Sequence, residues 1–169
     1  MIYKIVITIL LTVPYILGFK TGYTGDSGLA SHLLFPFSHA NIFHLACNLI
    51  AVWVLKWNMK NIIPSVAISF VASFLPGINI YPQLTMGASG IIFAAIGIMW
   101  GKYFSHEYFN TWLERDMDVL SGNVKKFFLY VLVPLAVMMF LPNVNFALHL
   151  YSLYLGMLYA FFHYVITKK

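Results

Sequence analysis

Six long apolar runs, none of which contains Asp, Glu, Lys or Arg, constrain this chain more than any other feature. They cover residues 5–19, 42–55, 62–75, 89–100, 127–141 and 146–162. Apolar residues make up 61% of the 169 residues and charged residues only 9%, whereas about a quarter of a soluble domain is charged. The sequence therefore predicts an all-α membrane protein, a six-transmembrane-helix bundle formed by a single domain over residues 1–169.

Several of these runs are shorter than the ~20 residues that a full membrane span needs. Proline and glycine mark the joints between them, at Pro36, Pro76-Gly77, Pro82 and Pro142. The first run follows Lys4 and resembles a signal peptide, but no small-x-small cleavage site follows it. We therefore expect residues 5–19 to form a spanning helix.

Lysine and arginine predict the orientation of the bundle. With the amino terminus inside, nine basic residues lie on the inner side and only Lys20 lies outside. The inner set is Lys4, Lys56, Lys60, Lys102, Arg115, Lys125, Lys126, Lys168 and Lys169. This asymmetry follows the positive-inside rule and places both termini in the cytoplasm. The net charge of +5 is thus explained by topology, and we expect no nucleic-acid partner.

Two connections carry further expectations. Residues 20–38, between the first two runs, are expected in the outer interface, with His32 at the membrane surface. The inner connection, residues 103–124, contains the cluster of charges and is either an amphipathic helix on the inner surface or a partly ordered loop. Its apolar residues at helical spacing are Phe109, Trp112, Leu113, Met117 and Leu120. Cys47 is the single cysteine, which excludes an internal disulfide, and we expect it to pack between helices.

Polar residues within three of the predicted spans fall at similar depths. Ser89 precedes Lys102 by 13 residues, His149 precedes the expected interfacial His163 by 14, and His44 precedes Lys56 by 12. At ~1.5 Å per residue these distances are roughly 18 to 21 Å. Each side chain then lies about 10 Å beneath the outer surface of a core ~30 Å thick. A helix that begins at this depth requires residues 77–86 to enter the membrane as irregular backbone, which is permitted beside protein or a water-filled cavity.

The five acidic residues all lie in predicted connections, and the sequence contains no His-Glu-x-x-His motif. An intramembrane Ser-His-Asp triad, an aspartyl pair and a zincin site are therefore excluded. The remaining candidate is a catalytic pair of serine and histidine, in which Ser89 would attack a carbonyl while His149 accepts its proton. Phe93, one turn after Ser89, is suited to stack on His149.

Donors for a tetrahedral oxyanion are available on two helices. They are the amide of Ser89 and the side chains of His44 and Asn48, which lie one turn apart. Small residues on the fourth and sixth spans, including Gly97, Gly101 and Gly156, are expected to let these helices approach closely.

These motifs, in this order, resemble those of the rhomboid intramembrane serine proteases of the minimal six-helix bacterial type. The HxxxN motif corresponds to His44-Leu45-Ala46-Cys47-Asn48, with the earlier histidine at His39, and the GxSG motif corresponds to Gly87-Ala88-Ser89-Gly90. The histidine of the sixth helix corresponds to His149. The resemblance implies a Ser89 and His149 dyad, with His44, Asn48, Gly87 and Phe93 as oxyanion or substrate-binding residues. It further implies hydrolysis of peptide bonds in or next to the transmembrane helices of membrane-protein substrates.

The chain departs from the family's usual pattern at two places. Ala30 and Ser31 occupy the positions of a common Trp-Arg pair in the first loop, and Ser152 stands where the sixth helix usually has glycine. The first departure concerns the conformation of the loop. The second concerns the approach of the fourth and sixth helices, and neither removes a reacting group.

Two other functions remain open at this stage. One is a catalytically inactive rhomboid-like protein that binds other membrane proteins. The other is a metal or haem membrane protein with His39, His44 and His149 as ligands, which would leave Ser89 without a role. For the protease we expect no cofactor and no metal. Its expected location is a bacterial plasma (inner) membrane, with the active site facing the outer side.

Overall fold

The structure is a computed structural model of residues 1–169, and it describes all of them except residues 25, 76–83, 115–121, 123, 139–143 and 168–169. Its elements in chain order are α1 (Ile2–Ile16), α2 (Leu29–Leu34), the 3-10 helix η1 (Phe35–Phe37), α3 (Ile42–Val54), α4 (Met59–Ala72), α5 (Ser89–Glu114), the π-helical turn η3 (Phe128–Leu132), α7 (Val133–Met138) and α8 (Phe146–Thr167). The described residues form no strand, although Tyr23 and Thr85 make one isolated antiparallel bridge. The fold is therefore all-helical, as the apolar runs predict.

Each apolar run overlaps with helical residues, and α5 and α8 extend furthest beyond their runs. Helix α5 continues to Glu114 and α8 continues to Thr167. Polarity alone does not end a helix, and residues 102–114 contain neither Pro nor Gly to do so. Residues 103–114 are therefore helical, as one of the two alternatives for the inner connection had it, but they continue α5 without a break instead of forming a separate helix. Met117 and Leu120, on the expected apolar face, lie outside the described residues.

The lengths of the helices bear on the number of membrane spans. Among the described residues, α8 alone is long and apolar enough to cross a bilayer by itself. One bent pair is long and apolar enough when taken as a unit: Leu29–Phe37 and Ile42–Val54, which meet at an angle of 79°. Helices α1 and α4 are apolar but shorter. The count of six spans and the side of the termini stay predictions.

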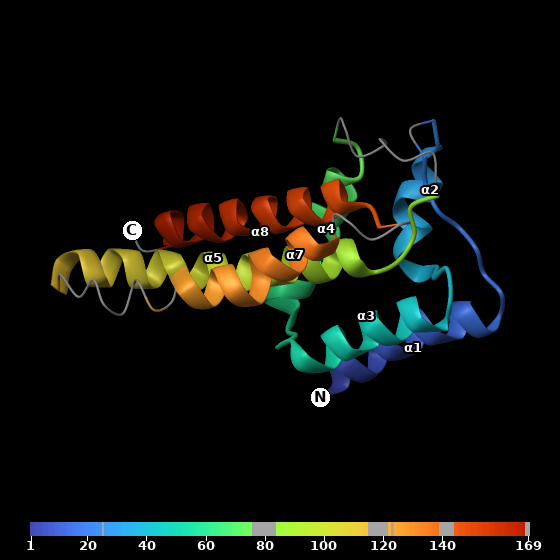
Figure 1. Ribbon diagram of the computed structural model, residues 1–169, viewed down its shortest axis with the longest axis horizontal. Helices are drawn as coiled ribbons and strands as arrows, with labels where there is room; N and C mark the ends of the chain where they lie inside the picture. Colours follow the sequence, from blue (N-terminus) through green and yellow to red (C-terminus); the bar gives the residue numbers. More distant parts are fainter. Residues whose placement is uncertain (25, 76–83, 115–121, 123, 139–143, 168–169) are drawn as a thin grey trace.

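Helices α5 and α8 pack most closely, and they lie side by side in Figure 1. A Cβ at Gly97 would collide with the carbonyl oxygen of Leu153, and one at Gly156 would collide with the carbonyl oxygen of Ala94. Only glycine allows two backbones to approach in this way. The close approach predicted for these helices is confirmed, and Ser152 is accommodated with no exposed surface.

Helix α3 reaches α5 through a cluster that also includes α1. Leu11, Leu45, Val52, Ala88 and Ile92 are buried together there. Because Ala88 and Ile92 flank the start of α5, this cluster holds the amino-terminal end of α5 against α3. Figure 1 shows α1 and α3 paired beside the longer helices.

The connection between α1 and α3 is tied to the end of α4. His32, expected near the membrane surface, is only 4% exposed and is enclosed by protein side chains. Its ring lies between Tyr23 and Phe74, with ring-centroid distances of 4.6 and 4.1 Å, and its Nδ1 is 2.8 Å from the Ser73 hydroxyl. Burial lowers the pKa of His32 below its ordinary value. A neutral imidazole therefore anchors this connection.

Candidate active site

Ser89 is the first residue of α5, and a tight turn brings it there. Gly87, two residues earlier, has a φ of +108°, a conformation that residues with a Cβ rarely adopt. Its backbone N–H donates to the carbonyl oxygen of Phe35 at 2.9 Å, which fastens the turn to η1. The turn leaves the half-buried Ser89 side chain at the amino-terminal end of α5, facing His149 of α8.

The Ser89 hydroxyl lies against the imidazole of His149, with 2.7 Å between Oγ and Nε2. His149 is on the first turns of α8 and is 6% exposed. Serine can donate this hydrogen bond when Nε2 is unprotonated, which is the arrangement that a general base requires.

Stacking orients the imidazole of His149. The ring lies over Phe93 with 4.6 Å between centroids and an interplanar angle of 20°. The predicted stacking partner is therefore confirmed. No described residue forms a hydrogen bond with Nδ1 of His149, so no carboxylate of the described chain holds the ring as an aspartate does in a triad.

His44 and Asn48 approach the same turn from α3. Asn41 caps this helix by accepting a hydrogen bond from the amide of His44 at 2.9 Å. A Cβ at Gly87 would lie 2.5 Å from Nε2 of His44 and 3.4 Å from Nδ2 of Asn48. Both side chains thus face the backbone two residues before Ser89. The structure brings together all six residues that the sequence singled out: Ser89, His149, His44, Asn48, Gly87 and Phe93.

Asn48 contributes a buried polar group that lacks a hydrogen-bond partner within the described chain. Asn48 is 6% exposed, and its Nδ2 has no hydrogen-bond partner among the described residues. An amide donor in this state costs about 1 to 3 kcal/mol. It is therefore available to a group that arrives from outside, such as an oxyanion.

His39 is fully buried behind the site. Its ring lies 5.2 Å from that of His44 at an angle of 68°. Within the described ranges, no three residues of the types His, Cys, Asp and Glu are grouped so that they could hold a metal ion. The metal or haem alternative, which needs His39, His44 and His149 together, gains no support from this geometry.

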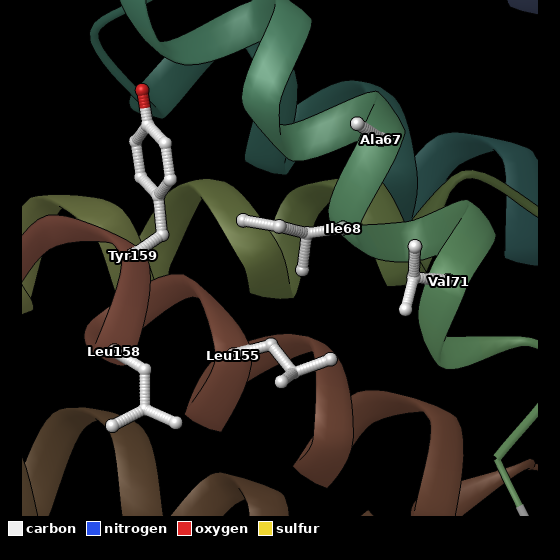
Figure 2. A pocket seen from close by; sticks show the side chains of 6 residues that line it. All are labelled: Ala67, Ile68, Val71, Leu155, Leu158 and Tyr159. Carbon is white, nitrogen blue, oxygen red and sulfur yellow. The ribbon is translucent and has the colours of Figure 1, made fainter. Parts of the chain in front are cut away.

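An open apolar pocket lies away from this site, between α4 and α8. Figure 2 shows its lining: Ala67, Ile68, Val71, Leu155, Leu158 and Tyr159. It contains neither Ser89 nor His149, and no residue in its lining carries a titratable group other than the tyrosine. This pocket has no part in the chemistry of the site.

Comparison with known proteins identifies the family. The model of the Rhomboid domain matches residues 27–165. The chain belongs to the rhomboid family. Searches of curated proteins and of solved structures found no match. Rhomboid proteins are membrane proteins and are generally intramembrane serine proteases, although the family also includes inactive members.

Sequence reasoning missed two residues beside the site and misplaced a third. Asn145 precedes α8 and accepts from the amide of Leu148 at 3.0 Å, and its Nδ2 donates to the Thr85 hydroxyl at 2.9 Å. An asparagine directly before an apolar run is a helix-start signal, which could have identified the cap. Nothing local predicts its bond to Thr85. Cys47, expected to pack between helices, is exposed on α3.

Proposed function

We propose that this rhomboid protein is an intramembrane serine endopeptidase. In this proposal Ser89 is the nucleophile and His149 is the general base. The observation that carries it is the 2.7 Å contact between Ser89 Oγ and His149 Nε2, in a family whose members generally hydrolyse peptide bonds within the membrane.

In the first step, Ser89 Oγ attacks the carbonyl carbon of the scissile bond and its proton passes to Nε2 of His149. The resulting oxyanion accepts hydrogen bonds from the Ser89 amide and from the side chains of His44 and Asn48. When the carbon–nitrogen bond breaks, His149 returns the proton to the leaving amine. A water molecule, deprotonated by the same imidazole, then hydrolyses the ester and regenerates Ser89.

The substrates in this proposal are membrane-anchored proteins whose transmembrane helix unwinds locally, with a small residue at the cut. The protein spans the membrane six times with both termini in the cytoplasm, and the site opens toward the outer side. This orientation rests on the nine inner basic residues against one. We further propose a bacterial plasma membrane as its location, and the mechanism uses no cofactor or metal.

Cleavage of a generic single-helix substrate in liposomes tests the dyad. Wild type should cleave, and Ser89→Ala and His149→Ala should each lower kcat by about 10³-fold or more, because each removes a reacting group. Ser105→Ala on α5 and His163→Ala on α8 are the matched controls and should cleave as wild type does. Ser105 donates to the Gly101 carbonyl and His163 is exposed, so neither touches the dyad.

A fluorophosphonate probe separates the protease from an inactive member of the family. An active serine should be labelled in wild type and not in Ser89→Ala. If wild type neither cleaves nor becomes labelled while its helix content is normal, the protein is a rhomboid-like binder of membrane proteins. The departures at Ala30, Ser31 and Ser152 would then be the first positions to examine.

A further inference from the structure

The segments that carry Ser89 and His149 are joined by a second hydrogen bond, four residues before the first in each segment. Asn145 Nδ2 donates to Thr85 Oγ1 at 2.9 Å, and Ser89 Oγ lies 2.7 Å from His149 Nε2. Thr85 precedes Ser89 by four residues, and Asn145 precedes His149 by four. The two bonds are therefore parallel links between the same two segments.

The orientation of the Asn145 amide follows from its other contact. Its Oδ1 accepts from the backbone N–H of Leu148 at 3.0 Å, which caps α8. An amide that uses its oxygen for the cap must present its NH₂ group on the other side, toward Thr85. The carbonyl oxygen of Asn145 also accepts from the amide of His149 at 3.4 Å. One residue thus connects the cap of α8, the backbone of His149 and Thr85.

Thr85 is itself held in place from the opposite side. Its amide donates to the Tyr23 carbonyl at 2.9 Å, and its carbonyl accepts from the Tyr23 amide at 3.0 Å. Tyr23 is fully buried, in a cluster with Phe35 and Leu148. The backbone of Thr85 is consequently held in place by Tyr23, and the start of α8 is attached to the Thr85 hydroxyl through Asn145.

This attachment matters because His149 has little else to orient it. Its Nδ1 has no hydrogen-bond partner in the part of the chain that the structure describes, and Phe93 stacking restrains only the plane of the ring. The backbone-to-backbone contacts between α5 and α8 lie further along both helices, at Gly97 and Gly156, and beside the dyad the α8 group that Gly90 faces is the side chain of Leu148. The bond from Asn145 to Thr85 adds a polar contact at the first turn of α8, where the contact of Leu148 with Gly90 is apolar.

We infer that Thr85 and Asn145 are positioning residues for the proposed dyad, and that their hydrogen bond sets the distance between Ser89 Oγ and His149 Nε2. The inference rests on the proposed protease function. A carboxylate bonded to Nδ1 orients the base in a triad. Here the start of α8 orients His149 instead, because its cap residue, Asn145, is hydrogen-bonded to Thr85 in the segment that precedes Ser89.

Steady-state cleavage by full-length protein in liposomes tests this inference with four variants. Thr85→Val keeps the shape and loses the hydroxyl, and Thr85→Ser keeps the hydroxyl. Asn145→Ser keeps a capping oxygen but is too short to reach Thr85. Thr85→Val/Asn145→Ser completes a double-mutant cycle. Thr12→Val on α1 is the matched control, because its hydroxyl is buried without a partner among the described residues.

We expect Thr85→Val and Asn145→Ser each to lower kcat by about three- to tenfold with KM unchanged, as loss of one hydrogen bond that acts through position predicts. The double variant should be no slower than the slower single variant. Thr85→Ser should restore kcat to within about twofold, and Thr12→Val should match wild type. The rate of fluorophosphonate labelling should change in parallel with kcat.

Three results would overturn the inference. They are full activity in Thr85→Val, multiplication of the two single effects in the double variant, and failure of Thr85→Ser to restore kcat. Each of these results requires a wild type that cleaves, so none of them argues against the protease function. A wild type that neither cleaves nor becomes labelled overturns the protease function, and the positioning role with it.

Discussion

At the scale of single residues, the site is defined by polar atoms that lack partners. Nδ2 of Asn48 and Nδ1 of His149 are both buried, and neither has a hydrogen-bond partner within the described chain. Buried donors are nearly always paired in stable proteins, and exceptions concentrate where function requires a free group. Asn48 faces Gly87 and His149 contacts Ser89, so both free groups lie beside the turn that carries the proposed nucleophile.

Asn48→Ala should therefore separate catalysis from stability. We expect kcat to fall by about 10²- to 10³-fold, as for other oxyanion donors, with little change in thermal stability, because Nδ2 has no hydrogen bond to lose. Cleavage assays and melting in detergent measure the two effects.

Asn61→Ala is the matched control for Asn48→Ala. Asn61 forms a capping box with Asn58 at the start of α4, so its loss should cost about 1 kcal/mol of stability and leave kcat unchanged. An Asn48→Ala protein that melts lower but cleaves normally would contradict the oxyanion role.

Acidic pH should weaken the anchor at His32. Burial lowers its pKa in the folded protein, so between that pKa and the unfolded value of about 6.5 the unfolded state binds more protons. The stability contributed by neutral His32 is complete above pH ~6.5 and is lost as the pH falls. Melting temperatures of wild type and His32→Gln across pH 5 to 8 measure this loss.

The pH dependence of melting should be smaller in His32→Gln than in wild type, and His163→Gln should behave as wild type because His163 is exposed on α8. Equal pH dependence in all three proteins would show that His32 is not the group responsible. The groups packed around His32 are Tyr23, Ser73 and Phe74, none of which carries a charge in this range.

At the scale of elements, the pairing of α5 with α8 carries the site. Gly97, Gly101 and Gly156 place backbone against backbone along this interface. Because the contact involves main-chain atoms, it cannot relax through a change of rotamer. The interface therefore fixes the separation of the two helices along Gly97, Gly101 and Gly156 more firmly than a layer of flexible side chains would.

Gly97→Ala should destabilise the protein, although alanine favours a helix by about 1 kcal/mol over glycine. The new Cβ would collide with the Leu153 carbonyl, and overpacking of this kind costs about 1 to 3 kcal/mol or more. We expect a net loss of stability in unfolding titrations, together with reduced cleavage.

Gly122→Ala is the control for Gly97→Ala, because a Cβ at Gly122 would meet nothing within 4 Å. It should unfold as wild type does. Unchanged stability in Gly97→Ala would mean that the two helices are separated further than the structure has them.

At the scale of the whole molecule, the charge distribution predicts which side of the membrane each connection occupies. Cysteine labelling can test this, since Cys47 is the single native cysteine. In a Cys47→Ser background, Asp26→Cys should react with an impermeant maleimide on intact cells. Lys56→Cys should react only after permeabilisation. Both positions are exposed in the structure, so a reversed pattern would invert the proposed topology.

Hydropathy was sufficient to predict the helices of the apolar runs, although not α2, η1 or the extension of α5 to Glu114, and motif spacing singled out the candidate site residues that the structure brings together. In a bilayer an apolar side chain can face lipid directly, so a run of apolar residues indicates a span whatever its tertiary contacts are. Likewise, His44, Asn48, Ser89 and His149 could be identified because each motif is local and their order along the chain restricts the chemistry. The stacking of Phe93 on His149 also followed from helical periodicity.

The features that the sequence did not predict all depend on contacts between distant segments. His32 is buried because the end of α4 covers it. Cys47 is exposed because another face of α3 meets α1 and α5. The bond from Asn145 to Thr85 joins residues that are 60 positions apart. The sequence by itself determined an all-helical membrane protein with a serine and a histidine suited to react. Only the tertiary structure decided their 2.7 Å separation, because that distance depends on contacts between segments that are far apart in the sequence.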